Sequence, residues 1–185
     1  MKNRDRLIVV LLLIGSLLFG VIQFVLIPRE NEKKEQYALS QKEPSAHDLN
    51  SILKYKSKYM GDHSNLINLF YNLPLSDVGM KFQLFPKELT LQVEYQEGVA
   101  GIGQQRVEEG VVYDSIAAFS LIDNLKVIRY DFPDGSYQVE RGDVEKRFGS
   151  LTKLLEAGRW QTEVQEKFLD HNVMKEMGEE ILKTK

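Results

Sequence analysis

The chain has 185 residues, a formal net charge of −3 and no cysteine. This length suits one domain of ordinary size with an appendage. The lack of cysteine excludes disulfide scaffolds, thiolate zinc sites, cysteine nucleophiles and lipid-modified cysteine anchors. The mild acidity argues against a nucleic-acid-binding protein, because such proteins usually carry a clear basic excess.

The first feature along the chain is an uncharged apolar segment of 21 residues, Leu7 to Ile27. As a helix it would extend roughly 30 Å, the thickness of the hydrocarbon core of a bilayer. A core helix that is apolar on every side is unusual in so small a domain, so we predict a transmembrane helix. A cleaved signal peptide is the alternative, but its apolar region is typically only about 7–15 residues long.

Basic side chains precede this segment. Lys2, Arg4 and Arg6 outweigh Asp5, which gives the chain up to Ile27 a charge of +2 and the remaining 158 residues a charge of −5. Positive residues beside a membrane helix usually stay in the cytoplasm. We therefore predict a single-pass protein of the cell membrane, with a cytoplasmic N-terminus and an extracytoplasmic C-terminal part.

Four regions follow from these patterns. Residues 1–6 form the cytoplasmic tail and residues 7–27 the membrane helix. Residues 28–46 carry eight charges and few large apolar side chains, so we predict a polar stalk. Residues 47–185 form the extracytoplasmic domain.

The domain begins with two predicted helices. Asp48 is a candidate N-cap for a helix that runs as far as Gly61. The second helix starts at Ser64 or Asn65 and ends before Pro74, which cannot continue a helix.

Alternation of apolar and polar residues predicts strands over 80–84 and 89–95, joined as a hairpin. A broadly apolar helix is expected over 111–125. Two further strands, 125–132 and 137–140, flank a strong turn signal.

The C-terminal part is expected to be helical. Asp143 would cap a short helix over 144–148, and a long helix is predicted from about 161 to 183. Regular βαβ alternation is absent, so the expected fold class is α+β, with a small antiparallel sheet of about four strands packed with helices.

Several of these segments resemble those of an uncharacterised family of extracytoplasmic domains, a domain-of-unknown-function family found in Firmicutes. The similar segments are Leu53–Ser64, Leu73–Leu75, Leu89–Tyr95, Ala117–Leu125 and Tyr137–Gly149. The resemblance covers roughly residues 48–149. It implies an envelope location, often behind a single membrane helix, and a small α+β fold. Within the family this resemblance points to, some members are attached to membrane metallopeptidases of the antibiotic-sensor type, and the resemblance implies no catalytic residue.

A glycine-rich loop over 98–103 is the first candidate binding element. It lacks a Walker lysine and the order of a dinucleotide fingerprint, so a flexible hairpin end is the simpler interpretation. If the loop binds a ligand, its backbone N–H groups, those of Gly101 and Gly103 among them, would contact it together with Gln104, Gln105 and Arg106, since mobile loops often carry function.

A basic and aromatic patch is the second candidate. Lys54, Lys56 and Lys58 alternate with Tyr55 and Tyr59. On a helix Lys54 and Lys58 would share a face and could contact anionic lipid or wall polymer. The alternative is a solvated lysine face with inward tyrosines.

Two S-x-x-K patterns occur, at Ser51/Lys54 and at Ser150/Lys153. Such a pair can provide a nucleophile and its base. The companion motifs are absent and the chain is too short for that enzyme fold, so we expect Ser150 to be a helix cap.

Other catalytic and metal-binding patterns are also weak. Histidine occurs at His47, His63 and His171, without the spacing of a helical metal site, so surface or turn positions are expected. The adjacent carboxylates Glu108–Glu109 and Glu179–Glu180 do not form acid–base pairs by themselves. The tripeptide Arg141–Asp143 spells an adhesion motif but sits at an expected turn and cap. We predict no metal and no cofactor.

We therefore expect a non-enzymatic, membrane-anchored envelope protein whose domain binds a protein partner or an envelope ligand, and not nucleic acid. One alternative is an extracytoplasmic sensor of a small molecule or peptide that acts through a membrane partner. Another is a small hydrolase with a scattered site. A deep cleft with convergent polar groups would favour these alternatives, whereas a flat apolar patch would favour the first function.

Overall fold

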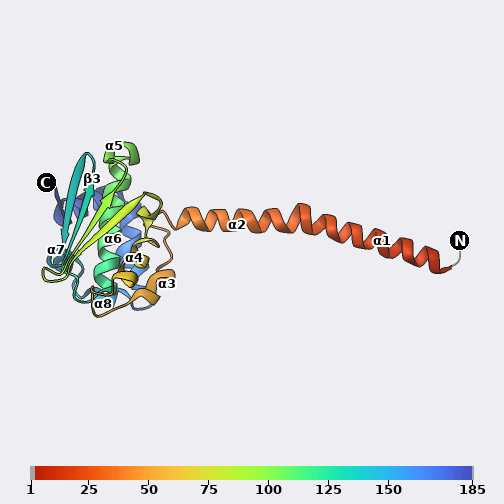
Figure 1. Cartoon of the computed structure of the whole chain (residues 1–185), viewed down its shortest axis with the longest axis horizontal. Coiled ribbons are helices and arrows are strands. Elements are labelled where there is room, and N and C mark those ends of the chain that lie inside the picture. Colours follow the sequence, from red (N-terminus) through yellow and green to blue (C-terminus); the bar gives the residue numbers. More distant parts are fainter. Residues whose placement is uncertain (1–2, 185) are drawn as a thin grey trace. The chain divides into compact units, whose positions relative to one another are not determined.

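The computed structural model describes residues 3–184, and the chain divides into two compact units, Met1–Ser40 and Gln41–Lys185. The first unit is helical (Figure 1): α1 (Asn3–Val21), a π-helical turn η1 (Ile22–Leu26) and α2 (Ile27–Ser40). The expected apolar helix is thus confirmed, and it is long and apolar enough to cross a membrane. A signal sequence near the N-terminus shares these features.

The π-helical turn lies just before Pro28. Proline has no backbone N–H, and its ring crowds the carbonyl four residues earlier, that of Phe24. The chain widens there, and the N–H of Ile27 donates to the carbonyl of Ile22. The helix then continues through the charged residues 28–40, so the first part of the expected stalk is helical.

The second unit contains one five-stranded sheet. Its strands are β1 (Met80–Phe85), β2 (Thr90–Tyr95), β3 (Val127–Phe132), β4 (Gly135–Glu140) and β5 (Leu182–Thr184). They lie in chain order. Strands β2 and β3 are parallel, and every other neighbouring pair is antiparallel. The α+β class is confirmed, but the expectation of about four antiparallel strands is wrong. A helical crossover makes one pair parallel, and the C-terminus adds a fifth strand.

Seven α-helices and four 3₁₀- or π-helical turns accompany the sheet in the described part of this unit. The helices are α3 (Leu49–Ile52), α4 (His63–Phe70), α5 (Val99–Ile102), α6 (Gln104–Leu121), α7 (Arg141–Phe148), α8 (Leu151–Leu154) and α9 (His171–Ile181). The turns are η2 (Leu53–Tyr55), η3 (Pro74–Asp77), η4 (Trp160–Val164) and η5 (Gln165–Leu169).

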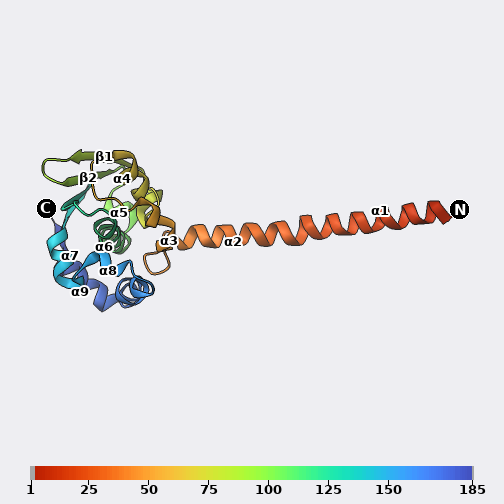
Figure 2. The same ribbon diagram turned by 90° about the horizontal axis from the view of Figure 1, so that it is seen from below.

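Helix α6 forms the centre of the second unit, and Figure 2 looks along it. Every residue from Gly110 to Leu121 is buried, so this helix packs on all sides. The turn η3 packs very closely against Gly110 of α6, since a Cβ atom at position 110 would lie 2.5 Å from Cγ of Leu75. The predicted helix over 111–125 therefore exists, but it begins at Gln104 and ends at Leu121.

The C-terminal end of α6 is closed by Arg141. Its Nη2 atom donates to the carbonyls of Phe119 (2.7 Å) and Ile122 (2.6 Å), and its Nε atom donates to the carbonyl of Leu125 (2.7 Å). A cation at a helix C-terminus also stabilises the helix, because it interacts favourably with the negative end of the helix dipole. The arginine of the adhesion tripeptide thus has a structural role. Asp143 lies inside the first turn of α7 and not at its cap.

The segment after Gly158 differs from the single long helix expected over 161–183. It forms the π-helical turn η4 and the 3₁₀ turn η5, then restarts as α9 and ends in β5. The carboxylate of Asp170 accepts hydrogen bonds from the N–H groups of Asn172 and Val173. This cap begins a new helix, which breaks the apparent continuity of the pattern.

The start of the second unit is held by buried polar contacts. His47 is only 2% exposed, so the expectation of a surface or turn histidine is wrong here. Its Nε2 atom lies 2.7 Å from the carbonyl oxygen of Asn72. Gln165 of η5 donates to the carbonyls of Pro44 (3.3 Å) and His47 (2.7 Å). Residues 41–48 are therefore tied to the domain through its C-terminal half.

Candidate functional site

A cleft of about 540 Å³ lies between the first half of α6, strand β4 and the α9–β5 segment. We call it the α6–α9 cleft. Its lining residues are Gln104, Gln105, Glu108, Glu109, Tyr137, His171, Met174, Lys175, Gly178, Glu179, Leu182 and Thr184. Three features of this lining matter: an apolar floor, an acidic rim and a position without a side chain.

The floor is formed mainly by Tyr137, Met174 and Leu182. Tyr137 and Met174 are 6% and 5% exposed, so their positions are fixed by packing. Met174 lies on the buried side of α9, and Leu182 follows where the helix passes into β5. Such a surface accepts an aliphatic or aromatic group.

The rim carries three carboxylates, Glu108, Glu109 and Glu179. Gln104 donates to Glu108 at 2.5 Å, and Gln105 donates to Glu109 at 2.8 Å. These are pairs one helical turn apart on α6. Because glutamine is neutral, the hydrogen bonds orient the two carboxylates without cancelling their charge.

No residue in the described part of the chain forms an ion pair with any of these three carboxylates. Two other glutamates of α9 behave differently, since Glu176 and Glu180 both pair with Arg147 on α7. The cationic side chain that lines the cleft is Lys175. The carboxylates of the cleft therefore lack an ion-pair partner among the described residues, whereas Glu176 and Glu180 share Arg147.

Tyr137 links the floor to the rim. Its hydroxyl accepts a hydrogen bond of 2.8 Å from Nε2 of Gln104. Burial raises the pKa of Tyr137, and the carboxylates of Glu108 and Asp134 raise it further, against the lowering effect of Gln104. The hydroxyl therefore stays protonated and available as a donor at neutral pH.

Position 178 contributes open space. Gly178 lies in the last turn of α9 and has no left-handed backbone angle. A Cβ atom there would lie 3.8 Å from Cδ1 of Leu182, which is an ordinary contact. The fold therefore does not require glycine at this position, although glycine weakens a helix.

Of the residues predicted in or beside the glycine-rich loop, Gln104 and Gln105 line the cleft. Arg106 points elsewhere and binds Asp77 at 2.6 Å. Gly101 belongs to α5, and Gly103 adopts a positive φ of 103° between α5 and α6. The interpretation of a flexible hairpin end is wrong, because residues 99–102 form a helical turn.

That turn is fixed by Asp134, in the turn between β3 and β4. The Asp134 carboxylate accepts hydrogen bonds from the N–H groups of Val99 (2.6 Å) and Ala100 (3.0 Å). These bonds lower the pKa of Asp134, so the cap stays ionised. The loop is a structural support for α6.

The basic and aromatic patch does not form as expected. Helical structure ends at Tyr55, so Lys54 and Lys58 do not share a helix face. The ammonium of Lys54 lies 5.0 Å from the ring centroid of Tyr55. Residue 57 instead forms a bridge with Ile122, which pulls the chain out of a helix. Neither lysine lines the cleft.

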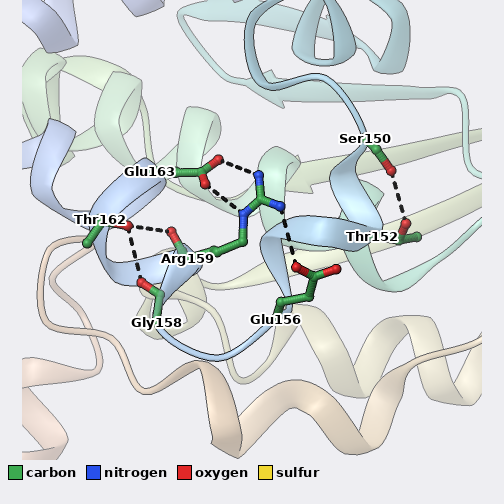
Figure 3. Close-up of polar contacts among 7 residues, drawn as sticks. All are labelled: Ser150, Thr152, Glu156, Gly158, Arg159, Thr162 and Glu163. Atoms are coloured by element: carbon green, nitrogen blue, oxygen red, sulfur yellow. Dashed lines mark hydrogen bonds and ion pairs between the residues drawn. The ribbon is translucent and has the colours of Figure 1, made fainter.

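The two S-x-x-K patterns have ordinary local contacts. Ser51 donates to the carbonyl of Asp48 at 2.7 Å, beside the confirmed Asp48 cap of α3. Ser150 precedes α8 at its N-cap position, but its hydroxyl contacts that of Thr152 at 3.2 Å (Figure 3) and makes no capping bond. Neither serine is hydrogen-bonded to the lysine of its pattern within the described residues.

Figure 3 also shows what organises the turn after α8. The guanidinium of Arg159 contacts both oxygens of Glu163 and one oxygen of Glu156. Thr162 closes the turn on the carbonyls of Gly158 and Arg159. This cluster holds the η4 turn in place and is not part of the cleft.

His171, Glu108, Glu109 and Glu179 are the cleft residues whose role the patterns in the sequence did not reveal. The sequence shows these histidine and glutamate residues, but it does not show that they lie near one another, because α6 and α9 are some sixty residues apart in the chain. Only the packing of these helices against each other brings them to one surface. The described residues contain no group of three His, Cys, Asp or Glu side chains that could hold a metal ion.

Comparison with known proteins adds one finding. Residues 52–141 match the family model described as Domain of unknown function (DUF4825). No curated protein and no solved structure matches the chain. The match extends from α3 into α7, so the α6 and β4 walls of the cleft lie inside it and the α9 wall lies outside. The expected resemblance to an uncharacterised domain family is thus confirmed over residues 52–141, and this part of the chain is similar to DUF4825 domains.

Proposed function

We propose that the protein is a membrane-anchored, extracytoplasmic domain that binds a small ligand or short peptide in the α6–α9 cleft without catalysis. The cleft volume of about 540 Å³ supports this proposal. Sites for small molecules usually measure about 300–1,000 Å³, with an apolar lining and a few convergent polar groups.

The fixed carboxylates also support binding. Glu108 and Glu109 are each held by a glutamine one turn earlier on the same helix. Groups that are oriented before the ligand arrives lose little freedom on binding. A binding site gains affinity from such preorganisation, and no reacting group is needed for it.

The apolar helix and the basic residues before it support the membrane anchor and its orientation. In this arrangement the cleft faces the outside of the cell. Envelope peptides and small molecules would reach it by diffusion.

A sensor function is the second candidate, favoured by one contact. Gln165 of η5 holds the carbonyls of Pro44 and His47, and η5 runs directly into α9. A ligand that shifts α9 would therefore act on residues 41–48, which follow α2 in the chain. Binding and signalling would then share one site.

Ligand binding can be tested with the full-length protein in detergent micelles. A panel of the twenty amino acids and N-acetylglucosamine is added while methyl NMR signals of methionine are recorded. We expect at least one compound to shift the Met174 signal while Met60, which is buried outside the cleft, stays unchanged. A panel that moves neither signal, or both alike, contradicts the proposal.

A further inference from the structure

We propose that the α6–α9 cleft binds an alkylammonium group, an aliphatic chain that ends in a primary amine. The ammonium would bind at the acidic rim that Glu108, Glu109 and Glu179 contribute to, and the aliphatic chain would lie over Met174 and Leu182. This inference rests on the proposed binding function and names the chemical class of its ligand.

The charge of the cleft carries the first step. Its lining holds three carboxylates against the single lysine Lys175, so it is negative by two charges when His171 is neutral. The carboxylates have no ion-pair partner among the described residues. A cation is attracted to such a site, whereas an anion would have to sit beside three like charges.

The number and origin of the carboxylates favour an ammonium. An ammonium has three N–H donors on one compact centre, and a primary amine is charged at neutral pH. Glu108 and Glu109 come from α6, and Glu179 comes from α9. A guanidinium prefers one coplanar carboxylate, whereas an ammonium can donate to any of these carboxylates in many orientations.

The floor requires the rest of the ligand to be apolar. Met174 and Leu182 offer only hydrocarbon and thioether surface, and the methionine side chain adapts its shape to a flexible chain. An inorganic cation would leave this surface in contact with water. A cation on an aliphatic stem covers the floor and reaches the rim together.

Gly178 keeps the space for that stem. Its backbone angles do not require glycine. A Cβ atom at this position would lie 3.8 Å from Cδ1 of Leu182, which is an ordinary contact. Any larger side chain at this position would extend into the cleft that Gly178 lines. The glycine is therefore the position at which the ligand would be admitted or blocked.

The test uses full-length protein in detergent micelles and follows the Met174 methyl signal during titration. The probe is n-butylamine, compared with 1-butanol and butyrate, which have nearly the same size but are neutral and anionic. We expect n-butylamine to bind about tenfold more tightly than 1-butanol or butyrate, because neither of these two compounds can donate a charge-assisted hydrogen bond to the carboxylates. The affinity should fall as KCl is raised from 50 to 300 mM, since salt screens the charges.

Two kinds of variant check the location of the probe. Glu179→Gln should weaken butylamine binding several-fold and leave butanol unaffected. Gly178→Leu should abolish binding of every probe. Gly142→Leu is its control, because Gly142 is an exposed helical glycine outside the cleft, and a Cβ atom there would have nothing within 4 Å. Thermal unfolding of each variant shows that the domain remains folded.

The outcomes separate the two proposals. Equal affinity for n-butylamine and 1-butanol would overturn the ammonium selectivity and leave cleft binding intact. Butylamine binding that persists in Gly178→Leu would also overturn it, since the amine then binds elsewhere. If neither these probes nor the amino-acid panel bind, both proposals fail.

The source of the amine is resolved by one more pair of probes, Nα-acetyl-lysine methylamide and its Nε-acetylated form. A lysine derivative that binds more tightly than n-butylamine identifies a peptide lysine as the ligand. Tighter binding of n-butylamine identifies a free alkylamine. In both cases the inference requires that Nε-acetylation, which removes the charge, abolishes binding.

Discussion

The Nδ1 atom of His47 lies 2.9 Å from the hydroxyl oxygen of Tyr113, although the two residues are 66 positions apart in the chain. The other ring nitrogen faces the carbonyl of Asn72, which can only accept a hydrogen bond. Nε2 must therefore carry the proton, and Nδ1 accepts from Tyr113. The Tyr113 oxygen in turn accepts from Nε1 of Trp160 at 3.1 Å. Every donor in this buried series is used when His47 is neutral.

Acid should weaken the domain through His47. Burial lowers the pKa of its imidazole below the usual 6.5, against the raising effects of Asn72 and Asp48. As the pH falls below 6.5, the unfolded chain binds a proton that the folded chain does not. The free energy of unfolding should therefore decrease, by at most about 1.4 kcal/mol per pH unit for one proton.

Fluorescence of Trp160, the single tryptophan and a buried one, can report this change during urea unfolding between pH 7.5 and 5. His47→Gln should remove the acid-induced loss, and the exposed His63→Gln should retain it. Burial raises the pKa of Asp114, which opposes the His47 effect because the folded chain then holds the extra proton. The difference between wild type and His47→Gln isolates the histidine. Identical pH profiles for these two proteins would refute the prediction.

Two glycines of helices should respond in opposite directions to alanine. Gly178→Ala should stabilise the domain by about 0.5–1 kcal/mol, because alanine favours a helix and its Cβ meets only an ordinary contact. Gly110→Ala should destabilise it by about 1–3 kcal/mol, because its Cβ would lie 2.5 Å from Cγ of the buried Leu75.

Urea unfolding of both glycine variants, followed by Trp160 fluorescence, measures these effects. The two changes differ only in their surroundings, so each serves as the control for the other. A stabilising Gly110→Ala would mean that η3 moves away from α6 without cost. That result would contradict the close packing of η3 on α6.

Local patterns predicted much of the fold. The alternation in β1 and β2 and the turn signal between β3 and β4 both correspond to antiparallel hairpins. Asp48 caps α3 as expected. These features depend on residues close together in the chain, where side-chain period and turn chemistry act directly.

Features that depend on distant contacts were not predicted. The parallel pairing of β2 with β3 is set by the route of the chain through α6, and alternation is the same for either direction. Strand β5 has three residues and is defined only by its pairing with β4. Of the predicted binding residues, Gln104 and Gln105 line the cleft, and the residues of the opposite wall were not predicted because that wall comes from α9.

The proposed orientation of the chain in a membrane gives a further prediction. Alkaline phosphatase fused after Lys185 should be active, because that enzyme requires export from the cytoplasm to form its disulfides. Green fluorescent protein at the same position, exported through the general pathway, should remain dark. Replacement of Lys2, Arg4 and Arg6 by glutamine should weaken this preference. Strong cytoplasmic fluorescence with an inactive phosphatase would place the domain inside the cell.

The cap on α6 gives the last prediction. Arg141→Ala should destabilise the domain by about 2–4 kcal/mol, because the carbonyl of Phe119 in α6 and those of Ile122 and Leu125 just after it lose a charged donor. Arg141→Lys should recover only part of this loss, since an ammonium cannot reproduce the planar fork that reaches Phe119, Ile122 and Leu125 together. Arg159→Ala is the control. Its ion pairs with glutamates are partly exposed, so its removal should cost less than about 1 kcal/mol. If urea unfolding gives equal losses for Arg141→Ala and Arg159→Ala, then Arg141 acts only as a surface charge and the end of α6 is held by packing alone.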